Sequence, residues 1–279
     1  MDLNVNSILK ITKIESLISG VLPSREETVG IAFGGGGARG FSHVGVIRAF
    51  EQYEVKPRII SGVSAGSIAA VLWGAGLDSA QIKECFAGTK FGQFTDMMLP
   101  RKALFKMNKF ARMLEEWLPI RNLEEMRIPT VICATDFDHA KSVGWAKGEI
   151  VPRVVASCSI PIVFPPVTIN GVHYVDGGVL RNLPAWAIRK HCSVLFGSNC
   201  SPLNRNYTPR DTLIATAIRS YQMMSKSNTL QDINLCDYMI QPVELGEFST
   251  FDMSKLDRAV EIGYAAASRV LERYLKQTQ

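Results

Sequence analysis

The sequence predicts an α/β fold with a central, mostly parallel β-sheet. Short apolar segments alternate with stretches of helical periodicity over most of the 279 residues, as is typical of parallel strands joined by helices. Two of these segments run through glycines directly into a helix, and 47% of the residues are hydrophobic, which is enough for one large core. We therefore expect one domain over residues 1–279, with its core at about 29–200.

The expected strands are short segments rich in Val and Ile. They lie at 29–33, 58–61, 130–135, 194–198 and 238–241. Helices are expected at 39–52, 67–74, 184–190, 211–230 and 255–276. The last helix has a broad apolar stripe from Val260 to Tyr274, so the segment 200–279 should complete the domain with C-terminal helices.

One β-hairpin is well defined by its turn. Residues 167–169 and 172–174 flank the dipeptide Asn170-Gly171, which accepts positive φ at both turn positions most readily. The hairpin brings Asp176 to the end of its second strand.

Two segments are less regular. Apolar residues recur near helical spacing between Ile8 and Val21, so residues 1–28 are predicted to form an N-terminal helical extension. Residues 90–119 are basic and rich in Met and Phe. They fit either a lipid-facing lid or a pair of helices that pack on the core, and we favour the second interpretation.

Composition narrows the class of function. The formal charge of +5 and the pI near 8.9 are spread along the chain, so nucleic acid is not an expected partner. The six cysteines are scattered without a C-x-x-C pair, and the four histidines lack metal-ligand spacing. We therefore expect reduced cysteines, no catalytic metal and no cofactor.

The sequence also predicts where the protein works. The first 22 residues lack the basic start and cleavage site of a signal peptide, and no apolar run of about 18 residues occurs. We expect a cytoplasmic protein with peripheral contact to a membrane surface, and the oligomeric state is left open.

A glycine-rich loop follows the first strand and reads Gly35-Gly36-Gly37-Ala38-Arg39-Gly40. Its backbone N–H groups can converge at a helix N-terminus, so its ligand should be an anion. The spacing also matches the dinucleotide-binding fingerprint, but the next strand, at 58–61, ends without the acidic residue that binds a ribose.

The second strand runs into Gly62-Val63-Ser64-Ala65-Gly66 and then into a helix. This strand, turn and helix are the context of a nucleophile elbow, in which a G-x-S-x-G serine adopts a strained conformation at a helix N-terminus. The small residues Gly62 and Gly66 relieve the crowding, and Ser64 is the candidate nucleophile.

A base must accept the proton of Ser64, and two assignments remain open on the residues alone. Asp136 with His173 or His191 matches the chain order of an α/β-hydrolase triad. Asp176, in Asp176-Gly177-Gly178 after the hairpin, is the other candidate, although an Asp-Gly-Gly on its own is most often a turn.

The three motifs together, in this order, resemble those of the patatin-like phospholipase family. The resemblance extends to Ala156-Ser157-Cys158-Ser159-Ile160-Pro161, with Phe164 and Pro166, and covers about 29–200. It implies a three-layer α/β/α sandwich and a Ser-Asp dyad of Ser64 and Asp176 without histidine. The oxyanion hole would then lie at Gly35, Gly36 and Gly37.

In the remaining motif positions, the resemblance implies supporting roles for Arg39, Gly40, Gly62, Gly66, Gly177 and Gly178. The expected activity is hydrolysis of phospholipid or other fatty-acyl esters through an acyl-enzyme. Two alternatives are a nucleotide-binding protein that uses the 35–40 loop and a catalytically silent lipid-binding protein of the same fold.

Overall fold

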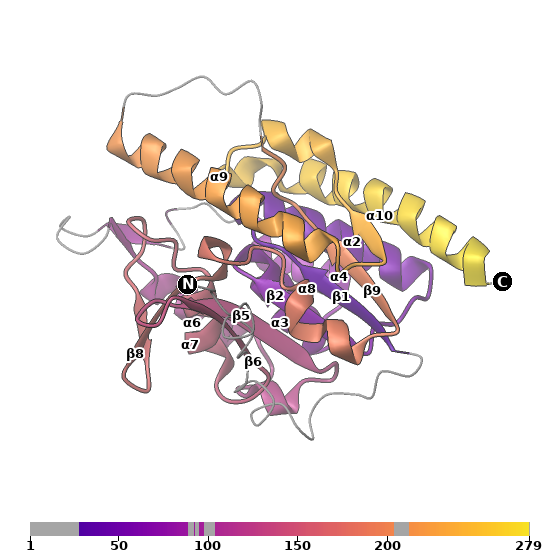
Figure 1. Ribbon diagram of the computed structural model, residues 1–279, viewed down its shortest axis with the longest axis horizontal. Helices are drawn as coiled ribbons and strands as arrows, with labels where there is room; N and C mark the ends of the chain where they lie inside the picture. The colour runs from indigo at the N-terminus through magenta and orange to yellow at the C-terminus, as the bar shows by residue number, and fades with distance from the viewer. Residues whose placement is uncertain (1–27, 89–91, 93–94, 98–103, 204–211, 279) are drawn as a thin grey trace, which may run out of the picture.

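A computed structural model of the chain describes residues 28–88, 92, 95–97, 104–203 and 212–278 (Figure 1). The extension predicted for residues 1–28 lies outside them, apart from Thr28. No helix among the described residues is long and apolar enough to cross a membrane.

In the described part of the chain the main sheet has eight strands, in the order β10-β9-β1-β2-β5-β8-β7, with β6 also paired to β5. The five parallel strands are β1 (Val29–Phe33), β2 (Ile59–Val63), β5 (Thr130–Asp136), β9 (Val194–Ser198) and β10 (Tyr238–Ile240). The three antiparallel strands are β6 (Lys141–Trp145), β7 (Val167–Ile169) and β8 (Val172–Asp176). The predicted α/β fold with a mostly parallel sheet is confirmed.

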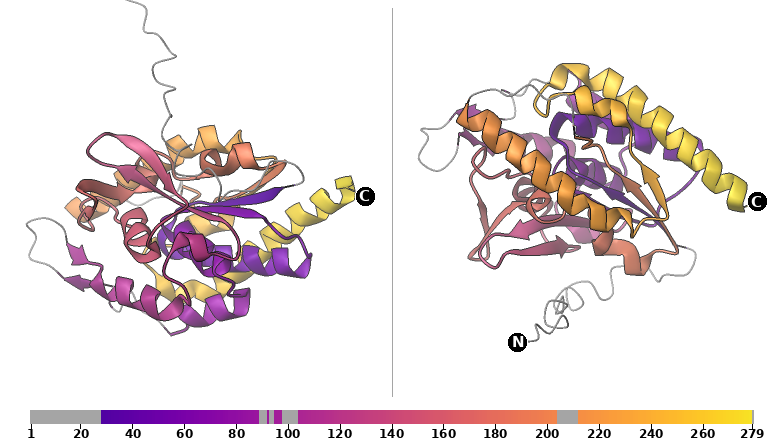
Figure 2. Two further views of the ribbon diagram at one scale, coloured as in Figure 1. Left: turned by 90° about the horizontal axis from the view of Figure 1, so that it is seen from below. Right: turned by 45° about the horizontal axis from the view of Figure 1, so that its top comes forward.

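Helices cover both faces of this sheet (Figure 2). One face packs against α2 (Ser42–Gln52), α3 (Ala65–Gly74), α4 (Ser79–Phe86), α6 (Asn108–Trp117), α7 (Ile150–Ser157) and α10 (Leu256–Thr278). The other packs against α8 (Ala185–Ile188) and the C-terminal end of α9 (Leu213–Ile233). Side chains that alternate along β1 pack into different helical layers. Ile31 and Phe33 face the layer that contains α2 and α3, and Ala32 faces the layer that contains α8. The result is a three-layer α/β/α sandwich.

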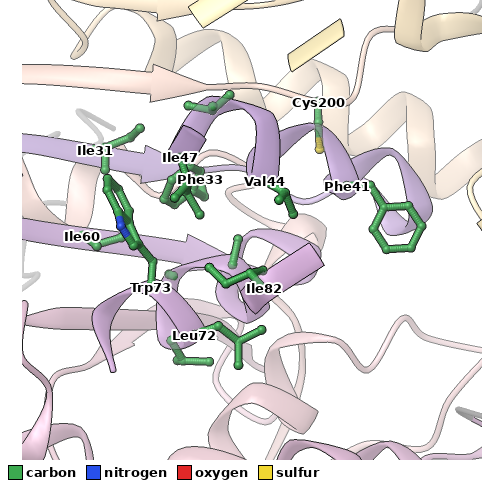
Figure 3. Packing of buried hydrophobic residues seen from close by; sticks show 14 of the residues in the cluster. Ile31, Phe33, Phe41, Val44, Ile47, Ile60, Leu72, Trp73, Ile82 and Cys200 are labelled. Atoms are coloured by element: carbon green, nitrogen blue, oxygen red, sulfur yellow. The ribbon is translucent and has the colours of Figure 1, made fainter. Parts of the chain in front are cut away.

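Aliphatic and aromatic side chains pack together in the largest of the core regions (Figure 3). Phe33 packs edge-on against Trp73 at 6.2 Å between ring centroids, and Phe50 packs against Phe196 at 5.1 Å. Phe41 and Ile82 lie farther along the same region and also line the apolar cavity described below. The core therefore continues directly into the functional site.

The predicted hairpin is present. Asn170 and Gly171 form its turn with φ values of 50° and 79°, and β8 ends at Asp176. Both strands pair as expected, with Val167 opposite Tyr174.

The helices α4 and α7 and the strand β6 were not among the predicted elements. The strand β6 pairs with β5 at the side of the sheet and contains Lys141, Ser142 and Gly144, so it lacks the apolar run of a buried strand. In α7, Pro152 looks like a helix breaker, but it lies in the first turn, where its missing N–H costs no hydrogen bond.

The helix α6 belongs to the segment for which two interpretations were open. It buries Phe110 and Leu114 in the core, as expected of a helix that packs on the domain. The preceding β3 (Asp96–Met97) and β4 (Phe105–Lys106) form a small two-stranded sheet. Residues 89–91, 93–94 and 98–103 lie outside the described part of the chain.

The helices α2 and α10 approach each other closely through two glycines. A Cβ added to Gly263 would lie 2.0 Å from the carbonyl oxygen of Ser42, and one added to Gly45 would lie 1.9 Å from that of Val260. Backbone atoms cannot move aside as side chains do, so this contact admits only glycine.

We expect Gly263→Ala to lower the free energy of unfolding by about 1 to 3 kcal/mol, because overpacking outweighs the better helix propensity of alanine. Urea unfolding measures the change. Gly92→Ala is the matched control, since an added Cβ there meets no described atom within 4 Å. Equal stability of the two variants would contradict the close helix contact.

Candidate functional site

Ser64 lies at the turn between β2 and α3. Its φ of 54° and ψ of −127° place it in a region that residues with a side chain rarely adopt, at a cost on the order of 1 to 3 kcal/mol. It is the N-cap residue of α3, so the positive end of the helix dipole adjoins its hydroxyl. The serine is 5% exposed. This is the geometry of a nucleophile elbow.

Two glycines allow this turn to pack against the sheet. A Cβ on Gly66 would lie 2.1 Å from the carbonyl oxygen of Phe33, and one on Gly62 would lie 2.4 Å from that of Gly66. Any larger residue would push α3 away from β1 and β2. The small residues of the motif therefore set the position of Ser64.

Asp176 ends β8 and caps a short 3-10 helix, η4 (Gly177–Val179). The side chain is fully buried, and Oδ1 accepts a hydrogen bond of 2.8 Å from the Gly178 N–H. No described donor is in full hydrogen-bond geometry with Oδ2. The hydroxyls of Ser64 and Tyr221 nevertheless lie near enough to the carboxylate to affect its ionisation.

The environment of Asp176 changes its proton affinity. Burial raises the pKa of Asp176 from 3.8 to about 6, against the opposing effect of hydrogen bonding from Ser64, Gly178 and Tyr221. The carboxylate is therefore still mostly ionised at pH 7, but it is a stronger base than an exposed aspartate. This combination suits a group that must accept a proton from a hydroxyl.

The end of α7 and the two residues after it hold both members of the Ser-Asp pair. The Ser64 N–H donates to Ser157 Oγ at 2.8 Å, and Ser157 Oγ in turn donates to the carbonyl of Cys133 at 2.6 Å. The Asp176 N–H donates to the carbonyl of Ser159 at 2.9 Å. The spacing of the two backbones is thus fixed by residues 157–159.

The glycine loop lies beside Ser64. The Gly34 N–H donates to the carbonyl of Ser198 at 2.9 Å, and the Gly35 N–H donates to that of Asn182 at 3.1 Å. The N–H groups of Gly36 and Gly37 have no partner within the described residues. Of the three predicted oxyanion donors, Gly35 is therefore engaged already, while Gly36 and Gly37 remain available.

The loop is braced from several sides. The Gly35 carbonyl accepts from Asn182 Nδ2 at 3.2 Å and from Ser201 Oγ at 2.5 Å. Arg39 is buried, and its Nε donates to the carbonyl of Phe248 at 2.8 Å. The guanidinium ties the loop to the C-terminal part of the chain, so stabilising the loop is a role that Arg39 has in the structure.

His43, on α2, supports the same loop from inside. Its Nε2 donates to the carbonyl of Gly34 at 2.8 Å, which leaves Nδ1 to accept from the Ser198 hydroxyl at 3.0 Å. Burial lowers the pKa of His43 to about 4, so the imidazole is neutral at physiological pH. Its two nitrogens are both occupied by the scaffold.

His139 and His173 fit a triad with Ser64 poorly. Asp136 pairs with His139 at 2.9 Å, and His173 pairs with Asp138 at 3.1 Å. Neither pair includes Ser64, so the described contacts do not assemble Ser64, Asp136 and His173. Among the described residues, no three His, Cys, Asp or Glu side chains gather as metal ligands would.

Ser64 borders two spaces, an apolar cavity and a smaller recess with more polar lining residues. The cavity encloses about 890 Å³, its open mouth included. Its walls are mainly apolar side chains, among them Phe41, Val44, Ile68, Phe86, Phe110 and Phe164. The smaller recess, which also borders Ser64, is lined by more polar than apolar residues, including Arg39, Asn182, Ser201, Tyr221 and Gln222. Gly37 borders both spaces.

Sequence reasoning missed Tyr221, which lies on α9, more than 40 positions after Asp176. A signal was present in the spacing of polar residues along this helix, because Tyr221, Ser225, Asn228 and Asp232 recur at helical intervals. Such a polar stripe looks like an exposed face, but here it points toward the site.

Comparisons with known proteins agree with this geometry. The family model described as "Patatin-like phospholipase" matches residues 31–188, more than half of the chain. The chain is 24% identical to an uncharacterized NTE family protein of Mycobacterium tuberculosis, covering 88% of this chain and 46% of that protein. It is 27% identical to the lysophospholipase NTE1 of Mycosarcoma maydis, covering 88% of this chain and 15% of that protein.

Among solved structures, VipD from Legionella pneumophila aligns with a TM-score of 0.56 at 16% identity, covering 90% of this chain and 68% of VipD. This likeness shows the fold. The chain spans less than half the length of these curated relatives.

The fold and the site define a patatin-type α/β protein with a serine at a nucleophile elbow. On the family match, the chain belongs to the patatin-like phospholipase family. This membership supports lipid hydrolysis as the general class of activity.

We expect Ser157→Ala to lower the free energy of unfolding by about 1 to 3 kcal/mol, since it leaves the buried Ser64 N–H without its acceptor. Denaturant unfolding measures this loss. Ser220→Ala on the exposed surface is the control and should change little. Unchanged stability of Ser157→Ala would show that this hydrogen bond does not hold the turn.

Asp176→Asn should raise the stability of the folded chain at neutral pH. The pKa of Asp176 is higher in the folded chain than its usual 3.8, so ionisation above about pH 6 destabilises the fold. This rise in pKa corresponds to a destabilisation on the order of 3 kcal/mol when Asp176 is ionised. The neutral amide of Asn avoids that cost. The gain should be absent below pH 4, grow between pH 4 and 6, and persist above pH 6.

Urea unfolding of wild type and Asp176→Asn across this pH range tests the idea. Asp252→Asn is the control of opposite sign, because hydrogen bonds from Ser254 lower the pKa of Asp252. A constant difference between Asp176→Asn and wild type at every pH would contradict the raised pKa.

Proposed function

We propose that the chain is a serine acyl hydrolase that cleaves fatty-acyl esters of lipids, of the phospholipase A or lysophospholipase type. Ser64 is the nucleophile and Asp176 is its base. The observation that supports this most is the fully buried Asp176 carboxylate beside the Ser64 hydroxyl, with its pKa raised to about 6 by burial. A base of that strength next to a strained serine can accept the serine proton during acyl transfer.

In the first half of the reaction, Ser64 Oγ attacks the ester carbonyl while its proton passes to Asp176. The negative charge that develops on the carbonyl oxygen is stabilised by the Gly36 and Gly37 N–H groups, each donor contributing about 2.7 to 4 kcal/mol. Collapse of the tetrahedral intermediate breaks the bond to the alcohol, which takes the proton from Asp176. The product is an acyl group on Ser64.

In the second half, water replaces the alcohol. Asp176 accepts a proton from the water as it attacks the acyl-enzyme, and the same N–H groups stabilise the second tetrahedral intermediate. Ser64 leaves and regains its proton, which releases the fatty acid.

The two spaces beside Ser64 suit the two parts of a lipid ester. The apolar cavity accommodates a hydrocarbon chain, because burying each CH₂ group there is favourable by about 0.8 kcal/mol. The smaller recess, which has more polar lining residues, suits the alcohol portion, and the Arg39 guanidinium in its wall suits an anionic group. A dinucleotide ligand fits less well, since the larger of the two spaces beside the glycine loop is apolar.

Ser64→Ala is expected to abolish turnover of lipid and p-nitrophenyl esters, by at least about a thousandfold, because it removes the nucleophile. A fluorophosphonate probe should label the wild-type chain and not the variant. Ser220→Ala serves again as the control and should keep full activity and labelling. A wild-type chain that neither turns over esters nor reacts with the probe would instead be a silent lipid-binding protein.

A further inference from the structure

The inner face of α9 makes an unusual polar contact with the loop that follows Asp176. Ser225 Oγ donates to the Gly178 carbonyl at 2.9 Å, and Asn228 Nδ2 donates to the same carbonyl at 2.9 Å. One turn farther along, Asp232 forms two hydrogen bonds of 2.7 Å with the guanidinium of Arg181. Ser225 and Asp232 are buried, so this face exists to hold the loop rather than to meet solvent.

Tyr221 is the next residue of this face toward the N-terminus of α9, one turn before Ser225. Its hydroxyl reaches over Gly178, since a Cβ added to that glycine would lie 2.1 Å from the hydroxyl oxygen. Gly178 also donates its N–H to Asp176 Oδ1. The glycine therefore makes room for the Tyr221 hydroxyl beside the carboxylate.

The Tyr221 hydroxyl remains a donor throughout the pH range of interest. Burial and the negative charge of Asp176 raise the pKa of Tyr221 well above its usual value. A phenol that stays protonated next to an acceptor-only carboxylate can only donate to it. Tyr221 also lines the recess that Ser64 borders, so it lies within the site.

We propose that Tyr221 is a positioning residue of the Ser-Asp pair, whose hydroxyl donates to the Asp176 carboxylate, orients it toward Ser64 and favours its ionised form. This inference rests on the proposed function and deepens it, because it assigns to α9 a part in controlling the base. The polar stripe of α9 then has a chemical purpose: Ser225 and Asn228 fix the loop, and Tyr221 acts on the carboxylate itself.

Few other groups face Asp176. Ser64 approaches it from the elbow between β2 and α3, and Cys158 approaches it from the segment after α7. Burial and the negative charge of Asp176 raise the pKa of Cys158, so the thiol stays neutral. Tyr221 is the contribution of α9. Among the described residues, no Lys, Arg or His affects the ionisation of Asp176.

The test is the pH profile of kcat/KM for a soluble p-nitrophenyl ester, measured for wild type and Tyr221→Phe between pH 5 and 8.5. The wild-type profile should rise with an apparent pKa near 6, the value for Asp176. Loss of one hydrogen bond to the charged form should move this rise to higher pH by about one unit. The variant would then be about fivefold less active at pH 6 and nearly equal to wild type at pH 8.

Tyr264→Phe is the matched control, because it removes a hydroxyl whose partner is Gln52 on the surface, at 2.7 Å. Its profile should coincide with that of wild type. A Tyr221→Phe profile with an unmoved rise, or with an equal loss at every pH, would overturn the assignment and leave Tyr221 a packing residue.

A second measurement does not depend on turnover. In protein labelled with ¹³C at the aspartate carboxyl carbons, the signal of Asp176 is identified by its loss in Asp176→Asn, and its titration gives the pKa directly. The pKa should be higher in Tyr221→Phe than in wild type. No turnover by wild type would count against the proposed function alone, whereas an unchanged titration would count against the role of Tyr221.

Discussion

The burial of the Asp176 carboxylate against the Ser64 hydroxyl is the constraint around which the site is built. A carboxylate without its hydration shell costs stability in the ionised form, and this cost is what raises its pKa. A serine in a strained turn adds a second local cost. The fold tolerates both costs because the surrounding structure holds the Asp176 carboxylate and the Ser64 backbone in place.

Hydrogen bonds between separate parts of the chain supply that rigidity. Residues 157–159 accept the backbone N–H groups of Ser64 and Asp176. Asn182 holds the glycine loop through Gly35 and receives its own support from Asn228 on α9. The nucleophile turn, the aspartate loop and the glycine loop are therefore parts of one hydrogen-bonded network rather than three independent motifs.

The same network includes a histidine, His43, whose role in the structure is to support the glycine loop. His43, neutral and held between Gly34 and Ser198, supports the glycine loop and has no free nitrogen for Ser64. In triads an aspartate orients a histidine, which accepts the proton. In the proposed mechanism the buried aspartate, whose own pKa is raised to about 6, would take over the histidine's role.

The sequence by itself determined the order of the strands along the chain, the helices that follow β1 and β2, and the hairpin that ends at Asp176. These features depend on local patterns: apolar runs, glycines at a tight turn, and Asn170-Gly171 at positive φ. It singled out Ser64 by its strand-turn-helix context, whereas Asp176 was chosen because three motifs in this order resemble those of a known family. The strand β6 and the Pro-containing α7 escaped prediction, since their local patterns point elsewhere.

Only the tertiary structure decided which groups surround the dyad. Tyr221 and Asn228 reach the aspartate loop from a helix whose polar stripe looks exposed in the sequence. The tertiary structure also decided the role of the Gly35 N–H. The motif predicts it as an oxyanion donor, but it already donates to the carbonyl of Asn182. Hydrogen bonds between residues far apart in the chain depend on how the layers pack. Burial raises the proton affinity of Asp176, and burial too is a property of the packed layers alone.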